Sequence, residues 1–341
     1  MNKKKVVDIH IQVFGLGDSG KGCFISKDFI FSNTFISMLM ALKVDSFNLS
    51  DEKIKNVLLN TIDTSEKIDC AVLLAIDGVH KNGKFILSES QIVIPNDYVI
   101  DLVKDNKRLL FGASVHPYRE AKQMLSETER CINEGAVLFH WIPSSQQINP
   151  EDERCIPFYI RLVRGGIPLI CNTGEEFSRT SSLINGNSNR FNDIRRLIKA
   201  LDIGLKIIVS QGSFTYHAQP FQHLGRNTFE ELMGMLRVSE EKKWNLYADI
   251  SSFCTPSRIT YLERIKKEID NGNISRKRFL YGSGFPTPVV DINILRKSLN
   301  PNELLKYIRQ QRNLLDNTYN ILREFGIHDS IFTNAWDVLR L

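Results

Sequence analysis

The chain has 341 residues, of which 42% are hydrophobic and 24% are charged, so it is long enough to bury a sizeable core. The formal net charge of +5 comes from basic residues interspersed with acidic ones, which argues against a nucleic-acid-binding face, and no apolar run reaches the length of about eighteen residues that a membrane span needs. The six cysteines show no zinc-finger spacing. We therefore expect a cytoplasmic protein with reduced thiols and no nucleic-acid or membrane partner.

Eight short runs rich in Val, Ile, Leu and Phe predict β-strands. In chain order they cover residues 6–14, 70–77, 109–115, 136–141, 168–173, 206–211, 245–251 and 279–285. Stretches with helical spacing alternate with them, at residues 51–62, 119–133, 153–164, 192–201, 228–242 and 257–271. This alternation is typical of βα units around a parallel sheet, and eight strands in one chain of this length favour a closed (β/α)8 TIM barrel.

The predicted domain organisation is a single barrel domain over residues 1–341, with a helical tail from about residue 300 to 341. Asn82-Gly83, placed between Val79 and Ile86, predicts a hairpin turn added after the second strand. In such a barrel the active site lies at the carboxyl ends of the strands, so the residues that end each run are the candidates for function. Alternation along the strands predicts an inward-facing set: Asp8, His10, Gln12, His140, Asn172, Gln211, Asp249, Ser251 and Gly284.

The strand ends, taken together and in order, resemble those of the amidohydrolase superfamily, in particular its branch of decarboxylases and lactonases. The segments that carry the resemblance are DIHIQ at 8–12, SVHPYR at 114–119, FHWIP at 139–143, LICNTGEE at 169–176, IIVSQ at 207–211, ADIS at 248–251 and YGSGFP at 281–286. The resemblance covers nearly the whole chain and implies the same barrel.

The resemblance also implies a metal site, which this sequence departs from at five of six positions. The family pattern has DxHxH on the first strand, a lysine on the fourth, histidines on the fifth and sixth, and an aspartate base in GSDxP on the eighth. Only His10 matches it. The remaining positions hold Gln12, His140, Asn172, Gln211 and Gly284.

These replacements change the chemistry that the site can perform. A catalytic zinc needs about three strong ligands and an open water position, and amides are poor zinc ligands. We therefore expect no catalytic metal and no other cofactor. The amides of Gln12, Asn172 and Gln211 instead predict either an internal polar network or a pocket for a small polar molecule.

Several other residues have a functional and a structural interpretation. The sequence GLGDSG at 15–20 spells a dinucleotide-binding motif, but no acidic residue ends a strand about twenty residues later, so a flexible loop over the barrel mouth is favoured. His116 and Arg119 are placed either to contact an anionic ligand or to pack and cap the following helix. Cys171 alternates away from Asn172, which points its thiol toward the helices.

The loops after the fifth and sixth strands supply the remaining candidates. Glu175 and Glu176 could orient His140 or act as acid/base groups, and a solvated loop pair is the alternative. Tyr216, His217 and His223 lie where active-site lids often form, although each histidine alone is more typical of a surface.

Three functional hypotheses remain open. The first is a metal-independent hydrolase, lactonase, decarboxylase or cyclase acting on a small polar or anionic molecule, with His140, His10 and Asp249 as catalytic groups. Its ligand-binding residues would be Gln12, His116, Arg119, Asn172, Glu175, Gln211 and His217. The second is a catalytically silent pseudoenzyme that acts as a binding or assembly protein; a homo-oligomer is possible under any of the three hypotheses. The third is a metal hydrolase with a rebuilt site at His10, His140 and His116.

Overall fold

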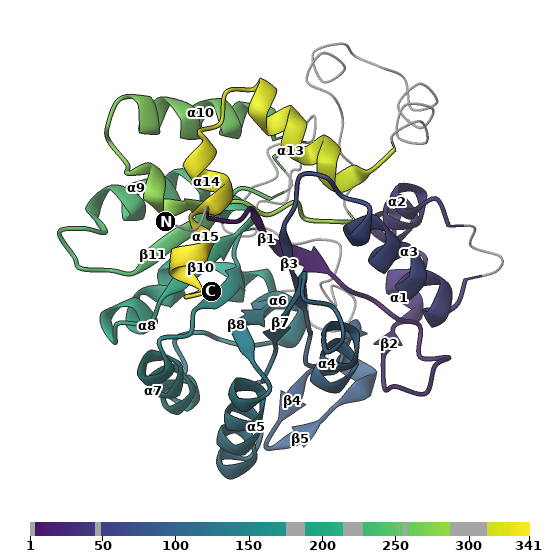
Figure 1. Cartoon of the computed structure of the whole chain (residues 1–341). Coiled ribbons are helices and arrows are strands. Elements are labelled where there is room, and N and C mark those ends of the chain that lie inside the picture. The colour runs from purple at the N-terminus through teal and green to yellow at the C-terminus, as the bar shows by residue number, and fades with distance from the viewer. Residues whose placement is uncertain are drawn as a thin grey trace.

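The computed structural model describes residues 4–44, 49–174, 188–213, 228–251, 253–254, 258–286 and 312–341. Its centre is one eight-stranded sheet in which the neighbours that pair run parallel and follow the chain order (Figure 1). The strands are β1 (Val7–Gln12), β3 (Cys70–Leu74), β7 (Leu109–Ala113), β8 (Ala136–Trp141), β9 (Leu169–Asn172), β10 (Ile207–Ser210), β11 (Leu246–Asp249) and β12 (Phe279–Leu280). Each of the eight predicted strands is present.

Backbone hydrogen bonds between β1 and the segment that continues β12 join the two edges of this sheet. Ile9 N donates to Tyr281 O at 3.1 Å, and Gln12 N donates to Phe285 O at 2.8 Å. Gly284 N returns a bond to His10 O at 3.1 Å. The sheet therefore curls into a nearly closed barrel, which confirms the predicted TIM-barrel fold.

Helices surround the barrel, as Figure 1 shows. They are α1 (Lys27–Ile30), α2 (Asn33–Leu42), α3 (Asp51–Asp63), α4 (Asn96–Val103), α5 (Ala121–Asn133), α6 (Pro143–Gln146), α7 (Ile156–Gly165), α8 (Ile198–Asp202), α9 (Thr228–Val238), α10 (Ile259–Asp270), α13 (Leu314–Glu324), α14 (Asp329–Thr333) and α15 (Ala335–Val338). Local signals set their ends: the Ser50 hydroxyl caps α3 by accepting from Lys53 N, and Gly166, with φ of 64°, ends α7. Within the described residues, none of these helices is long and apolar enough to cross a membrane.

Two small ribbons decorate the barrel. Strands β4 (His80–Lys81) and β5 (Lys84–Phe85) form the predicted hairpin, whose turn residues Asn82 and Gly83 both have positive φ. Strands β2 (Phe24–Ile25) and β6 (Ile92–Val93) pair antiparallel and join the segment after β1 to the segment after β3.

The lower part of the barrel interior is filled by apolar side chains. The inward set is Val7, Ile9, Val72, Leu74, Leu138, Ile170, Ile208 and Leu280, with Leu110 and Tyr247 packed against it. Ala335, Val338 and Leu339 of the C-terminal segment belong to the same cluster, so α15 closes the amino end of the barrel. A larger cluster fills the space between the strands and the surrounding helices. Polar groups can therefore enter the interior at the opposite end, where the strands finish.

Strand β1 departs from the alternation that the sequence predicts. Its register against β3 shifts between Asp8 and Ile11, and Val7 and Ile9 lie in the inner apolar cluster. The His10 side chain nevertheless contacts residues of β10 and β11, which are separated from β1 by β12. These contacts require His10 to point into the barrel. The irregularity therefore places Ile9 and His10 on the same side of β1. Asp8 instead accepts hydrogen bonds from His10 N and Ser283 N, which helps to close the barrel.

Candidate active site

A layer of polar side chains lies directly above the apolar interior, at the carboxyl ends of the strands. His140, Asn172, Ser210 and Asp249 each follow an inward apolar residue by two positions, and His10 joins them through the irregularity in β1. All five side chains are buried. We refer to His10, His140, Asn172, Ser210 and Asp249 as the mouth layer.

The shortest contact in this layer joins His10 to Asp249. The His10 Nδ1 atom lies 2.6 Å from Asp249 Oδ2, and both side chains are fully buried. The hydroxyl of Ser251 donates to the same carboxylate oxygen at 2.7 Å, and Ser251 N donates to Oδ1 at 2.6 Å. The hydroxyl of Ser210 lies 3.3 Å from His10 Nδ1. Asp249 is therefore held in place by Ser251 and fixes one edge of the imidazole.

This pairing determines the proton distribution on His10. A carboxylate accepts hydrogen bonds, so Nδ1 carries the proton of the neutral ring and Nε2 keeps a lone pair. The side-chain nitrogen of Gln12 lies 3.2 Å from His10 Nε2 and can donate to it. The arrangement leaves Nε2 as a proton acceptor that faces the side chain of Gln12.

Gly282 allows the two partners to approach each other. A Cβ atom at this position would lie 2.6 Å from Asp249 Oδ1 and 2.8 Å from His10 Cβ, closer than real Cβ atoms come to their neighbours. The inward-facing set predicted from the sequence contains Gly284 but not Gly282. The signal was present in the YGSGFP segment, because a glycine next to a strand end often marks a close backbone approach.

His140 is the second imidazole of the layer. Its Nδ1 atom lies 3.0 Å from the carbonyl oxygen of Ala75, so Nδ1 donates and Nε2 is again the lone-pair nitrogen. Its ring meets the ring of His10 edge-on, with centroids 6.3 Å apart. The structure thus brings the three predicted catalytic residues, His10, His140 and Asp249, to one place, whereas their catalytic role stays a prediction.

The two other amides differ in their surroundings. Asn172 is 5% exposed, and its Oδ1 atom accepts no hydrogen bond from any residue in the described part of the chain. Gln211, with φ of 53°, turns out of β10, and its Oε1 atom accepts from Arg258 at 3.2 Å. The interior of the mouth layer therefore holds a buried acceptor that a ligand could satisfy.

The described donor set does not fit the metal that the family pattern implies. His10 uses Nδ1 on Asp249, and Asp249 is engaged by His10 and Ser251, so neither the carboxylate nor this nitrogen is turned toward a shared centre. No group of three His, Cys, Asp or Glu side chains suited to a metal occurs among the residues that the structure describes. Two imidazoles and neutral amides fall short of the three strong ligands of a catalytic zinc site.

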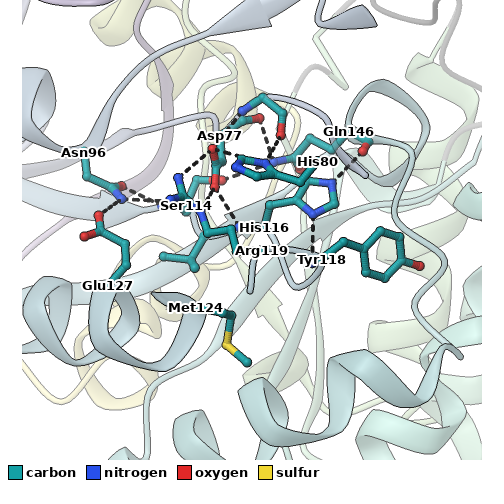
Figure 2. Close-up of polar contacts among 12 residues, drawn as sticks. Asp77, His80, Asn96, Ser114, His116, Tyr118, Arg119, Met124, Glu127 and Gln146 are labelled. Carbon is teal, nitrogen blue, oxygen red and sulfur yellow. Dashed lines mark hydrogen bonds and ion pairs between the residues drawn. The ribbon is translucent and has the colours of Figure 1, made fainter. Parts of the chain in front are cut away.

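His116 and Arg119 belong to a second polar cluster, the loop network, which Figure 2 shows around Asp77. Arg119 donates to both oxygens of Asp77, at 2.8 and 3.0 Å, and His116 N donates to Asp77 Oδ2 at 2.8 Å. The Gln146 amide donates to Asp77 O at 3.0 Å. These contacts tie together the segments that follow β3, β7 and β8.

Both ring nitrogens of His116 are engaged within this network. Tyr118 N donates to Nδ1 at 3.0 Å, and Nε2 donates to Gln146 O at 2.8 Å. Burial lowers the pKa of His116 to about 3, although Asp77 acts in the opposite direction, so the ring is neutral at physiological pH. The geometry gives His116 and Arg119 a structural role at the mouth, and the ligand contacts expected of them stay a prediction.

The glycine-rich segment at 15–20 surrounds a carboxylate of the protein itself. Asp51, the first residue of α3, accepts from the backbone of Leu16, Gly17 and Ser19 and from the Ser19 hydroxyl. Burial alone would raise the pKa of Asp51, but these bonds hold it below its usual value. The backbone donors that would cradle a phosphate are already occupied, and the loop is fixed to α3.

Five of the remaining candidates cannot be placed. Glu175, Glu176, Tyr216 and His217 lie outside the described residues, as does His223. Cys171 does belong to the outer cluster between strands and helices, and burial raises the pKa of its thiol well above the usual value.

Comparison with known proteins supports the fold. No protein-family model and no curated protein matches the sequence. Solved structures that do match include 5-carboxyvanillate decarboxylase LigW from Sphingomonas paucimobilis, with 12% identity, a TM-score of 0.56, and coverage of 99% of this chain and 100% of that chain. The IDCase of Metarhizium anisopliae matches with 12% identity, a TM-score of 0.54, and coverage of 98% and 97%.

A probable 2-pyrone-4,6-dicarboxylic acid hydrolase from Acinetobacter baumannii, solved with citric acid bound, matches with 10% identity, a TM-score of 0.53, and coverage of 99% and 100%. These matches are TIM-barrel proteins, so the barrel fold that the resemblance of the strand ends implied is confirmed. At such low identity, the likeness assigns no reaction to this chain.

Proposed function

We propose that this amidohydrolase-like barrel is a metal-independent enzyme that transfers a proton to or from a small polar molecule bound at the mouth layer. The observation that carries the proposal is the buried 2.6 Å contact between His10 Nδ1 and Asp249 Oδ2. His10 acts as the acid/base group, Asp249 orients it and stabilises its protonated form, and His140 supplies a second imidazole 6.3 Å away between ring centroids.

The chemistry follows from the proton distribution. With Nδ1–H held by Asp249, His10 Nε2 accepts a proton from a bound substrate, and the adjacent carboxylate stabilises the resulting imidazolium. The hydroxyls of Ser210 and Ser251 lie 3.3 and 3.1 Å from His10 Nδ1, the nitrogen that Asp249 holds. Neither serine is therefore placed for activation by Nε2, and we propose general acid/base catalysis without a serine nucleophile.

Metal independence rests on the chemistry of the donors. Asp249 is committed to His10 and Ser251, and Gln12 and Asn172 offer only neutral amides. The solved neighbours are named for hydrolysis and decarboxylation of carboxylic acids. Hydrolysis, lactone opening, decarboxylation and ring closure all require a proton transfer that a buried histidine can perform. The reaction of this chain is proposed to belong to this group.

The proposal is tested by turnover after removal of metals. Protein dialysed against a chelator is assayed with a panel of lactones, activated esters, amides, amidines and aromatic carboxylic acids, with product release measured for each. We expect turnover on at least one of these compounds without added metal. His10→Gln and Asp249→Asn should lower it by roughly 10²-fold or more, within the range for a lost acid/base group.

His328→Gln is the matched control, because His328 is exposed and caps α14, far along the chain from the mouth layer. Its turnover should equal that of the parent protein. Activity that disappears with the chelator and returns with zinc would contradict the proposal. A complete lack of turnover across the panel, with ligand binding retained, would instead favour the silent binding protein.

A further inference from the structure

Both imidazoles of the mouth layer use their N–H groups on acceptors of the protein itself. His10 Nδ1 faces Asp249 Oδ2 at 2.6 Å, and His140 Nδ1 faces Ala75 O at 3.0 Å. Since a carboxylate and a carbonyl can only accept, each ring carries its proton on Nδ1. The Nε2 atom of each neutral ring consequently carries a lone pair, and on His10 this atom already faces the Gln12 side-chain nitrogen at 3.2 Å.

The buried amide of Asn172 adds another acceptor to the same layer. Asn172 follows the inward Ile170 by two residues, which turns its side chain into the barrel, and its Oδ1 atom receives no hydrogen bond from the described residues. An unmet buried acceptor costs free energy unless a ligand or water donates to it. The negative charge of Asp249 lies in this layer as well, and it favours donors and positive charge nearby.

Two arginines near the mouth, among the residues that the structure describes, are bonded to protein partners. Arg119, which the sequence suggested for an anionic ligand, is bonded to both oxygens of Asp77. Arg258 donates to the Gln211 amide oxygen, beyond the end of β10. A carboxylate bound against the Nε2 atoms of these histidines or against Asn172 Oδ1 would place its oxygens against lone pairs.

We propose that the mouth layer recognises a small molecule through N–H or O–H groups that the molecule donates, as an amine, amidine, amide or polyol does, and not through a carboxylate. This inference deepens the proposed function, and it rests on the site assigned there. It separates this chain from its solved neighbours in substrate class, because it replaces an anion by a neutral or cationic donor.

A matched pair of probes tests the inference by binding alone. Acetamidinium and acetate have the same size and planar shape, but the first presents N–H donors and the second presents only acceptors. Each is titrated, in the presence of a chelator, into protein labelled with ¹⁵N in its histidines, and the ring nitrogen signals are followed. We expect acetamidinium to shift Nε2 signals of the mouth histidines saturably and acetate to leave them unchanged.

Variants identify the site. Asn172→Leu removes the acceptor at similar volume and should weaken acetamidinium binding roughly tenfold, whereas Asn172→Asp makes the acceptor charged and should tighten it. Asn56→Leu makes the same substitution on the exposed face of α3 and should have no effect. The Asp variant keeps the test decisive if the Leu variant does not fold.

Acetate that binds as tightly as acetamidinium at these nitrogens would overturn the inference. So would acetamidinium binding that is the same in Asn172→Leu, Asn172→Asp and the parent protein. The proposed function is judged separately, by turnover. Donor-selective binding without any turnover would leave this inference standing and count against catalysis.

Discussion

Gly282 is a single residue on which the geometry of the site depends. Its missing side chain lets the segment after β12 pass beside the His10–Asp249 pair, where a Cβ atom would lie 2.6 Å from the carboxylate. The sequence around Gly282 does not reveal this requirement, because the atoms that a side chain at Gly282 would meet belong to residues 10 and 249. The strand ends identified His10 and Asp249 as candidates, but not that a glycine brings them together.

We predict that Gly282→Ala separates His10 from Asp249. The methyl group must displace backbone or the buried pair, so the free energy of unfolding should fall by about 1–3 kcal/mol, as for other overpacked sites. The contact between His10 Nδ1 and Asp249 Oδ2 should also lengthen, and NMR can follow this change through the chemical shift of the Nδ1–H proton. Gly234→Ala in α9 is the control, since nothing lies within 4 Å of a Cβ there and the helix should gain stability.

The ion pair between Arg119 and Asp77 gives a second prediction about a single side chain. Arg119→Met leaves the buried Asp77 carboxylate without its cation and should lower the free energy of unfolding by about 2–3 kcal/mol, less than for a fully enclosed pair because the Arg119 side chain is 27% exposed. Asp77→Asn in the same chain should restore part of this loss in denaturant titrations. Additive losses in the double variant would show that the two side chains do not interact.

Among the elements, the glycine-rich segment shows how a motif can mislead. Residues 15–20 match a dinucleotide-binding pattern, and the absence of an acidic strand end spoke against that function. The structure supplies a physical role, because the backbone donors of this segment bind Asp51 at the start of α3. The expected loop is present, but it is tied to a helix that begins about thirty residues later in the chain, which a local pattern does not reveal.

Removal of the Asp51 carboxylate should therefore release this loop. In Asp51→Ala the amides of Leu16, Gly17 and Ser19 lose their common acceptor, and their hydrogen exchange should accelerate while that of β1 stays slow. Asp51→Asn, which keeps one acceptor oxygen, should give an intermediate result. Equal exchange rates in the parent protein and in Asp51→Ala would contradict the role assigned to this carboxylate.

For the barrel as a whole, the sequence predicted the architecture better than it predicted the site. Apolar runs marked all eight strands, since strands buried on both faces are apolar along their length. Alternation failed on β1, where the irregularity places Ile9 as well as His10 inside. The bonds of Arg119 and His116 to Asp77 could not be predicted from the sequence either. They join residues some forty positions apart and depend on how the loops meet above the closed barrel.

Stability of the whole molecule should depend on pH through His116. Burial lowers its pKa to about 3 in the folded chain, against 6.5 for an ordinary histidine. Between these values the unfolded chain binds a proton that the folded chain does not, so stability from this group is full above about pH 6.5 and falls as the pH drops toward 3. His116→Gln should be less stable at pH 7 but lose less stability on acidification, as urea titrations at several pH values can measure.

In the mouth layer proposed for this barrel, Asp249 and His10 bind each other and do not bind a metal. Calorimetric titration of zinc into chelator-treated protein, compared with the same titration of His10→Gln, tests this directly. We predict that neither protein shows a stoichiometric site that depends on His10, because its Nδ1 atom is bonded to Asp249 and the neighbouring amides are weak ligands. One equivalent of tightly bound zinc in the parent protein that is lost in His10→Gln would contradict the account.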